Sequence, residues 1–500
     1  MKTVFLLFDS LNRNALECYG GDRVATPNFN RLAERSAVFD CHYAGSLPCI
    51  PARREMQTGR LNFLHRSWGP IEPFDICFPE LMKEAGVTSH LISDHYHYWE
   101  DGGAGYHTRF GSAEFVRGQE RDLWKAMVQP PMERFRERYH WTLSGMERRA
   151  PNMINREFIK DETDFPIVRC IGLAEDFIAH NHHADDWFLQ VELFDPHEPF
   201  HVPARFREAL KTGYSGPILD WPVYDRMDIS ADEADELRAN YAAIVAMCDH
   251  YLGRLLDRFD TLDLWRETAL IVTTDHGFLL GEHGWWGKNR MPFYDEIVRI
   301  PLIAWHPDHA SASEPGGKRV AALTQTIDLM PSLLEMHGIA SPDGVEGRSI
   351  WPLLSGAQTI REAGLFGIFG GALNMTDGRH ITFRYPADPA APLYEYTLMP
   401  MHPASYFTAE EFAGAELRRD LGFTRDYPVL RLPALAGASR PPMQGGELDD
   451  AANAAYDITA DPGQTAPLDD PALEARLAQT MRRMMAEHQA PAELYTRFGL

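Results

Sequence analysis

Residues 46–60 read Ser-Leu-Pro-Cys-Ile-Pro-Ala-Arg-Arg-Glu-Met-Gln-Thr-Gly-Arg, and this stretch places a thiol, a proline and two adjacent cations at a predicted helix start. Pro51 suits the first helical turn, where its missing N–H has no partner to lose, so Cys49 should lie just outside the helix N-terminus. The free N–H groups of that terminus, together with Arg53, would hold an oxyanion beside position 49. The alternative is that Cys49 is a small buried apolar side chain.

Four apolar runs elsewhere in the chain end abruptly in polar side chains. Residues 3–8 and 269–274 have the continuous apolar or β-branched character of strands buried on both faces. Open α/β sheets bind ligands beyond the carboxyl ends of their strands, so we expect the residues that follow these runs to gather at one edge of a sheet. They are Asp9, then Asp94 and His95, then His197 on a loop stiffened by prolines, and finally Asp275 and His276.

The alternation of strand-like and helix-like segments predicts an α/β fold up to about residue 363. A segment from about 100 to 165 is rich in Arg, Glu, Trp and Met, fits the alternation poorly, and is predicted to be a helical insertion. From residue 364, short runs separated by Gly, Pro and Asp predict a small antiparallel sheet. We therefore expect a catalytic domain over 1–363 and a smaller domain over 364–500.

Two further segments have recognisable patterns. Ser230 and Glu233 have the spacing of a capping box and open a long amphipathic helix predicted over 231–259. The span 431–446 is rich in Pro and Gly and is predicted to be a long surface loop.

The composition describes a large and strongly acidic chain. Of its 500 residues, 72 are acidic and 48 basic, and the net charge of −24 argues against nucleic acid or an anionic membrane surface as the main partner. No apolar run approaches the roughly 18 residues of a membrane span, and the N-terminal run is too short for a signal peptide, so we expect a cytoplasmic protein. The 6 cysteines lack Cys-x-x-Cys spacing, which indicates neither a disulfide framework nor a zinc knuckle.

The polar residues at the strand ends have the chemistry of a metal site. Asp9, Asp275 and His276, beside the helix start, would form an oxygen-dominated site for one divalent cation. Such hard ligands favour Ca²⁺, Mg²⁺ or Mn²⁺ over Zn²⁺. Lys288, in the glycine-punctuated loop after these residues, and Arg53 would stabilise negative charge on a bound anion.

Several of these segments resemble a known family. Cys49-Ile50-Pro51-Ala52-Arg53 resembles the Cys-x-Pro-x-Arg signature of type I sulfatases, and Thr58-Gly59-Arg60 resembles its downstream extension. The resemblance extends to residues 195–199, 274–277, 281–288, 343–349 and 456–462. It implies the fold of the alkaline phosphatase superfamily, which is a large mixed sheet flanked by helices with a smaller C-terminal α+β domain that contains an antiparallel sheet.

The resemblance also implies a mechanism. In that family a dedicated enzyme oxidises the signature cysteine to formylglycine, and one hydroxyl of the hydrated aldehyde attacks sulfur while the second drives the release of sulfate. Carried over to this chain, one divalent cation, with Ca²⁺ as the first expectation and Mg²⁺ or Mn²⁺ as alternatives, would be held by Asp9, modified Cys49, Asp275 and His276. The catalytic residues would be Cys49, Arg53, His197 and Lys288, and the substrate contacts His95 and His283.

Three positions depart from the family pattern. Ala52 replaces a serine, a change that the modification signature tolerates. Ser10 stands where sulfatases usually carry a second aspartate, and residues 93–96 read Ser-Asp-His-Tyr where they commonly read Gly-Lys-Trp-His. Asp94 thus replaces a lysine that contacts sulfate, and we expect a less cationic cleft. Phosphonate monoester hydrolases, close relatives that also use formylglycine, depart at the last two places.

We therefore predict a sulfuric ester hydrolase that cleaves a sulfate monoester, with a phosphonate monoester or phosphodiester hydrolase using the same site as the alternative. A phosphate mutase of the superfamily would use serine or threonine at position 49 and usually two metals. An inactive protein that binds sulfated glycans would not need the metal ligands and Lys288. The expected partners are a small sulfated substrate and a formylglycine-generating enzyme, and the insertion would form a lid or a homo-oligomer contact.

Overall fold

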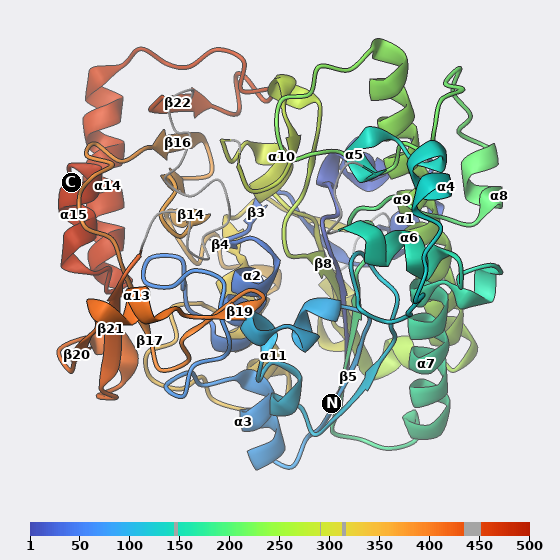
Figure 1. Cartoon of the computed structure of the whole chain (residues 1–500). Coiled ribbons are helices and arrows are strands. Elements are labelled where there is room, and N and C mark those ends of the chain that lie inside the picture. The colour runs from blue at the N-terminus through green and yellow to red at the C-terminus, as the bar shows by residue number, and fades with distance from the viewer. Residues whose placement is uncertain (145–148, 291, 313–316, 435–451) are drawn as a thin grey trace.

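An eight-stranded mixed sheet forms the centre of the molecule (Figure 1). The computed structural model describes residues 1–144, 149–290, 292–312, 317–434 and 452–500. The strand order is β12-β2-β11-β8-β1-β7-β5-β6, in which β8 to β6 run parallel and β11 is antiparallel to both of its neighbours. In that order the strands are Lys318–Val320, Ala37–Phe39, Leu302–Trp305, Thr268–Thr274, Lys2–Phe8, Trp187–Leu193, Thr88–Ser93 and Ser112–Phe115.

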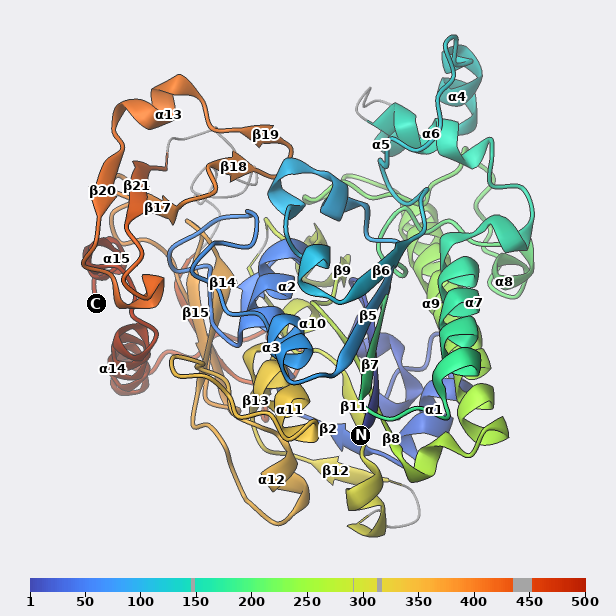
Figure 2. The same cartoon turned by 90° about the horizontal axis from the view of Figure 1, so that it is seen from below.

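Helices cover both faces of this sheet, as Figure 2 shows. One face packs against α1 (Pro27–Ala33), α7 (Pro166–Asn181) and α9 (Ala231–Thr261), and the other against α2 (Cys49–Thr58), α3 (Phe78–Glu84) and α11 (Leu329–Met336). Alternate side chains of a strand point to opposite faces, so Phe8 of β1 packs into the first layer and Phe5 into the second. The continuous apolar run of β1 therefore reflects a strand buried on both sides.

A five-stranded sheet with the order β22-β16-β15-β14-β4 forms the smaller part of the molecule (Figure 1). The antiparallel strands are β14 (Gly364–Ile368), β15 (Leu373–Thr376), β16 (His380–Arg384) and β22 (Ala454–Asp457), and α14 (Pro471–Glu487) and α15 (Ala492–Phe498) pack against them. β4 (Ser46–Leu47) lies just before Cys49 and pairs in parallel with β14. The C-terminal sheet therefore holds the segment that leads into α2.

The remaining elements are short. β3 (His42–Tyr43) pairs with β13 (Thr324–Gln325), and β9 (Leu279–Leu280) with β10 (Trp286–Gly287). β17 (Tyr394–Thr397), β21 (Val429–Pro433) and β20 (Glu416–Arg418) form a small sheet, and β18 (Met401–His402) and β19 (Ser405–Tyr406) a hairpin. The short helices are α4 (Met132–Arg138), α5 (Trp141–Ser144), α6 (Ala150–Arg156), α8 (Ala204–Glu208), α10 (Asp295–Val298), α12 (Trp351–Leu354) and α13 (Ala409–Ala413).

The predicted fold class is confirmed, and the capping box of Ser230 and Glu233 opens α9. Three local expectations change. Helix α2 begins at Cys49 itself, with Pro48 at the N-cap. The segment 100–165 contains helices but also β6, which extends the main sheet beside β5. The predicted loop over 431–446 starts inside β21, and from residue 435 it lies outside the described residues.

The division of the chain at residue 363 and a homo-oligomer contact stay predictions.

In the described ranges, every helix is too short or too polar to cross a membrane.

Candidate active site

Two neighbouring strands deliver carboxylates to one edge of the main sheet. Phe8 of β1 pairs with Thr274 of β8, so Asp9 and Asp275 follow at the same level, and both are completely buried. Ser10, with a left-handed φ of 63°, donates its backbone N–H to Asp275 Oδ1 (3.0 Å) and its hydroxyl to Asp9 Oδ1 (2.7 Å). The turn after β1 thus fixes the two carboxylates relative to each other.

Cys49 lies directly against this pair. Its Sγ is 3.3 Å from His276 Nε2, 3.8 Å from Asp9 Oδ1 and 3.5 Å from Lys288 Nζ. Asp9, Cys49, Asp275 and His276 each present one possible ligand atom, and these atoms lie within 4.8 Å of one another. The structure therefore brings together the four residues that the sequence nominated as metal ligands.

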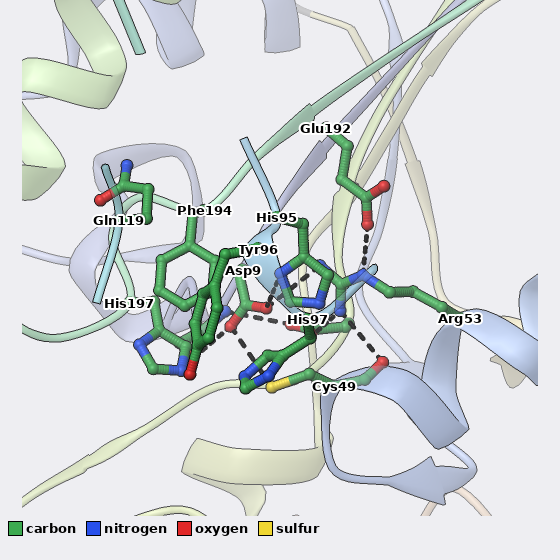
Figure 3. A network of polar contacts seen from close by, with 12 residues as sticks. Asp9, Cys49, Arg53, His95, Tyr96, His97, Gln119, Glu192, Phe194 and His197 are labelled. Carbon is green, nitrogen blue, oxygen red and sulfur yellow. Dashed lines mark hydrogen bonds and ion pairs between the residues drawn. The ribbon is translucent and has the colours of Figure 1, made fainter. Parts of the chain in front are cut away.

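Arg53 lies one turn further along α2, and its guanidinium joins the carboxylates of the cluster to the start of this helix (Figure 3). Its guanidinium donates to Asp9 Oδ2 (3.1 Å), Asp275 Oδ2 (2.6 Å) and Glu192, and also to the backbone oxygen of Cys49 (3.0 Å). A buried charge is costly unless it is paired, and here three carboxylates pair it. Arg53 therefore fixes both aspartates and the start of α2.

Lys288 approaches the cluster from the loop after β8. Its Nζ donates to Ser10 Oγ (2.8 Å) and lies 3.6 Å from Asp9 Oδ1. Burial disfavours its charge, but the neighbouring carboxylates of Glu198 and Asp9 raise the pKa of Lys288 above its ordinary value. A permanent positive charge is thereby held next to position 49.

The buried charges also shift the other ionisable groups. Burial opposes ionisation of Asp9, yet Lys288 and Arg53 outweigh it and hold the pKa of Asp9 well below its usual range. Burial lowers the pKa of His276, which keeps its imidazole neutral at neutral pH. Burial and the charge of Asp9 raise the pKa of the Cys49 thiol well above its ordinary value. An unmodified Cys49 is then a protonated thiol, which is a poor nucleophile and a poor metal ligand.

The donor set fits a divalent cation. His276 Nδ1 faces the backbone oxygen of Gly277 at 3.0 Å, which leaves Nε2 directed at Cys49 (3.3 Å) and Asp275 (3.4 Å). An outer hydrogen bond of this kind orients the ring of a metal-binding histidine. Ligands at right angles around Ca²⁺ are about 3.3–3.7 Å apart, given metal–oxygen distances of about 2.3–2.6 Å. The spacing of these donor atoms therefore needs little adjustment to hold an ion.

The net charge of the cluster also favours a divalent cation. Asp9, Asp275 and Glu192 pair directly with Arg53 and Lys288, so among these five side chains the carboxylates outnumber the cations by one. A divalent cation would change the net charge from −1 to +1, which suits a singly charged anion. Two carboxylates and one imidazole are donors that Ca²⁺, Mg²⁺ and Mn²⁺ accept.

Histidines from the end of β5 and from the loop after β7 lie beside Asp9 (Figure 3). His95 Nδ1 is 3.9 Å from Asp9 Oδ2, and neither ring nitrogen makes a hydrogen bond within the described part of the chain. His97 lines the cavity over Cys49, and so does His197, whose Nδ1 is 2.6 Å from the backbone oxygen of Glu198. His197 thus lines the cavity and His95 does not, and their predicted contacts with substrate stay predictions.

Asp94 itself does not line the cavity over Cys49, and the expectation of a less cationic cleft, which follows from the missing lysine, stays a prediction. Its Oδ1 accepts a hydrogen bond from Phe194 N (2.7 Å), and its Oδ2 accepts one from Gln119 Nε2 (2.9 Å), which also donates to Asp195 Oδ2 (3.0 Å). The carboxylate therefore braces the loop after β7 and does not line the cavity. Successive side chains of an extended segment point in opposite directions, so the next residue, His95, turns toward the cluster instead.

His283 is not brought to the cluster. Its ring stacks on Tyr294 with centroids 3.6 Å apart, and its Nε2 lies 3.4 Å from Glu296 Oε2. It does not line the cavity over Cys49. Its predicted contact with substrate therefore gains no support.

A family model described as Sulfatase matches residues 2–339. The chain belongs to the sulfatase family. It is 25% identical over 402 residues to the N-acetylglucosamine-6-O-sulfatase of Bacteroides thetaiotaomicron, covering 70% of each chain. Sulfate ester hydrolysis is accordingly the activity of this enzyme.

Solved structures share the fold of this sulfatase. One is an enzyme in complex with its substrate D-glucosamine-2-N,6-O-disulfate, with a TM-score of 0.65, 17% identity, and coverage of 98% of this chain and 97% of that one. Another is the phosphonate monoester hydrolase of Agrobacterium radiobacter, with a TM-score of 0.64, 17% identity, and coverage of 97% and 96%. The predicted resemblance to sulfatases is confirmed by the family model, and the solved structures share the expected fold.

Sequence reasoning missed several residues of this sulfatase site. Glu192 interrupts the apolar run of β7 and pairs with Arg53, and Tyr98 donates its hydroxyl to Glu192 Oε2 (2.9 Å). A charged residue inside a buried apolar run needs a partner of opposite charge. The position of Glu192 in the sequence therefore already indicated a buried ion pair. His97 belongs to the polar cluster that follows β5 in the sequence, but both it and Gln119 act from irregular segments whose path a sequence pattern does not define.

The Asp94–Gln119–Asp195 cluster predicts an unusual pH dependence of stability. Burial raises the pKa of Asp94 to about 7 and, together with the charge of Asp94, raises the pKa of Asp195. An acid with a raised folded-state pKa keeps its proton longer in the folded state, so the free energy of unfolding falls as pH rises from about 4 to about 7. The Asp94→Asn variant should therefore be more stable than the wild type above pH 7, by about 1–3 kcal/mol, and similar at about pH 4.

Urea unfolding across this pH range checks the expectation for Asp94. The exposed Asp22→Asn variant is the control, and its pH dependence should follow the wild type. If the free energies of unfolding of Asp94→Asn and the wild type change with pH in the same way, the raised pKa values of the buried pair are refuted.

Proposed function

We propose that this sulfatase cleaves a sulfate monoester through a formylglycine made from Cys49, with one divalent cation held by Asp9, Asp275, His276 and the modified residue. The observation that carries the proposal is the position of Cys49 in the first turn of α2, with Sγ 3.3 Å from His276 Nε2 and 3.5 Å from Lys288 Nζ. An oxygen formed there would be held between an imidazole and a cation. We favour Ca²⁺ because most of the ligand atoms are then oxygens. A formylglycine-generating enzyme is the partner that this chemistry requires.

The residues around position 49 have distinct roles in this proposal. When bound, the cation would neutralise the transferred group and lower the pKa of the hydroxyl it contacts. The hydrated aldehyde supplies one hydroxyl that attacks sulfur and a second whose deprotonation releases sulfate. Arg53 keeps both aspartates and the helix start in place, Lys288 stabilises charge on the non-bridging oxygens, and His197 protonates the leaving oxygen from the cavity wall.

Hydrolysis of phosphonate monoesters or phosphodiesters is the second candidate. It is favoured by Ser10, which replaces the usual second aspartate and accepts a hydrogen bond from Lys288 Nζ at 2.8 Å. Sulfate monoesters, phosphonate monoesters and phosphodiesters all present one negative charge to the cluster, whereas a phosphate monoester presents two. A cluster with a net charge of +1 after metal binding therefore accepts the first three more readily.

The choice is tested by comparing kcat/KM for four esters on one metal-loaded preparation, whose aldehyde content is verified by intact mass. We expect an aryl sulfate first, then phenyl phosphonate and a phosphodiester, and a phosphate monoester last, at least about tenfold below the first. A phosphonate monoester in first place would select the second candidate. A phosphate monoester in first place would show that the charge argument is wrong.

A further inference from the structure

We infer that Arg66 is a positioning residue, which holds the β18–β19 hairpin over the cavity beside Cys49 and thereby controls how tightly the leaving group of the substrate is bound. The inference rests on the proposed function, because it takes this cavity as the place where the ester binds. It is carried by the hydrogen bonds of one buried guanidinium and by the close approach of the hairpin to Gly102.

The hairpin forms one wall of the cavity. β18 and β19 pair so that Pro403 and Ala404 are the two residues of the turn between them. Both turn residues line the cavity, together with Cys49 and Lys288. Figure 2 shows the hairpin extending from the C-terminal part of the molecule toward the segment that follows β5. The C-terminal part of the chain therefore adds a wall to a site whose proposed catalytic residues all precede residue 289.

Arg66 joins the hairpin to the segment that follows α2. Its side chain is completely buried. Its Nη2 donates to the backbone oxygens of Met399 (3.0 Å) and Met401 (2.8 Å), where the hairpin begins. Its guanidinium carbon lies 5.4 Å from the ring centroid of Phe407, the residue that follows the hairpin. One guanidinium thus contacts the chain at both ends of the hairpin.

Two buried carboxylates fix the direction of this guanidinium. Its Nη1 donates to Glu395, and its Nε donates to Glu72 Oε1 (3.4 Å). Glu72 also accepts hydrogen bonds from Leu398 N (2.8 Å) and from the hydroxyl of Thr397. The nitrogens of a guanidinium lie at fixed angles in one plane, so holding Nε and Nη1 determines where Nη2 points. Arg66 is therefore a rigid link between the two carboxylates and the backbone of the hairpin.

A second contact holds the turn of the hairpin. Gly102 N donates to the backbone oxygen of Pro403 (3.0 Å). A Cβ at residue 102 would lie 2.7 Å from Pro403 Cα and 2.8 Å from the backbone oxygen of His402, so only glycine lets the hairpin lie this close. The same Cβ would lie 2.9 Å from the ring of Trp68, which also lines the cavity. The turn is thus placed over the cavity by Gly102 as well as by Arg66.

This arrangement predicts which kinetic constant Arg66 controls. Within the described ranges, every side-chain hydrogen bond of Arg66 goes to residues 67–72 or 395–401, and the metal cluster is not among them. In the proposed function the sulfate group binds at the cluster, so the leaving group must lie in the part of the cavity that the turn borders. A displaced turn would weaken binding of the leaving group before and during the reaction alike, which raises KM and leaves kcat nearly unchanged.

The Arg66→Lys variant of the full-length, metal-loaded enzyme tests the inference. Lysine keeps a positive charge for the two carboxylates, but its single nitrogen cannot also bond both backbone oxygens of the hairpin. We expect KM for an aryl sulfate to rise about tenfold and kcat to change by less than about twofold. The inhibition constant of inorganic sulfate should also change by less than about twofold, because this anion has no leaving group. Amide hydrogen exchange in residues 399–407 should become faster.

Arg497→Lys is the matched control. Arg497 is also a buried arginine, and its Nη1 donates to the backbone oxygens of Pro389 and Ala391 (3.0 Å each), but it does not line the cavity. This control should lose stability and keep the KM of the wild type. If Arg66→Lys likewise keeps its KM and only has fewer active molecules, the positioning role is overturned and the proposed function stands.

Two further outcomes are decided by other measurements. Gly102→Ala crowds the turn without changing the ion pairs, so it should also raise KM, and an unchanged KM in it overturns the inference if Arg66→Lys does not fold. If the wild type hydrolyses no sulfate ester, the proposed function fails. Hydrogen exchange in residues 399–407 and KM for a phosphonate monoester then decide the role of Arg66, which is refuted if Arg66→Lys changes neither.

Discussion

Replacing Cys49 by alanine should lower kcat/KM for a sulfate ester by at least about 10⁴-fold while the protein stays folded and retains most of its metal. The side chain is buried at the cluster, and its Sγ lies within 3.8 Å of His276, Lys288 and Asp9. Without the thiol, the residue cannot be oxidised to the aldehyde whose hydrate supplies the nucleophilic hydroxyl. Only one small atom leaves the interior, so the free energy of unfolding should fall by about 1 kcal/mol.

Turnover, thermal unfolding and metal content of the purified variant check this expectation. Cys77→Ala, at a completely buried cysteine at the N-cap of α3, removes the same atom outside the cluster and should change stability without changing turnover. Intact-mass analysis of the wild-type peptide that contains Cys49 shows whether the thiol has become an aldehyde. Substantial residual activity in Cys49→Ala would refute the covalent mechanism.

The strand ends were predictable because the pairing of parallel strands is regular. Buried apolar runs identified β1, β7 and β8 within one or two residues, and parallel pairing then places Asp9 and Asp275 at one level. The position of Pro51 predicted a helix start in this stretch, although α2 begins at Cys49 itself and not just after it. Local patterns thus located the residues that now surround position 49, although their roles in metal binding and catalysis stay predictions.

Long-range pairing and side-chain direction could not be predicted in this way. β4 has two residues and joins a sheet whose other strands begin more than 300 residues later, and nothing in its local sequence indicates that partner. Asp94 and His95 are adjacent in sequence, yet one braces a loop and the other faces Asp9. Which of two neighbours faces a site depends on the exact end of a strand, the least certain feature of a sequence pattern.

Asp275→Asn should lose both metal and activity, in contrast to Cys49→Ala. Asp275 Oδ1 accepts hydrogen bonds from Ser10 N (3.0 Å) and His276 N (2.8 Å), and Oδ2 accepts one from Arg53 (2.6 Å). If the asparagine oxygen keeps the two hydrogen bonds from the backbone N–H groups, its NH₂ group must face the guanidinium of Arg53. Both groups are hydrogen-bond donors, so they cannot bond to each other and the arginine must move. The variant then has one fewer anionic ligand and a displaced arginine, and metal affinity should fall by more than about 100-fold, beyond the range typical of changes outside the ligand shell.

Metal stoichiometry after dialysis, measured together with kcat/KM, decides this last expectation. Asp249→Asn is the matched control, because Asp249 is also a buried carboxylate that accepts backbone hydrogen bonds, from Asn28 N and Phe29 N (2.9 Å each), but it caps α1 away from the cluster. That control should lose stability and keep its metal. A normal metal content in Asp275→Asn would refute the ligand assignment even if activity is lost. The loss of activity would then come from the displacement of Arg53 and not from the loss of a metal ligand.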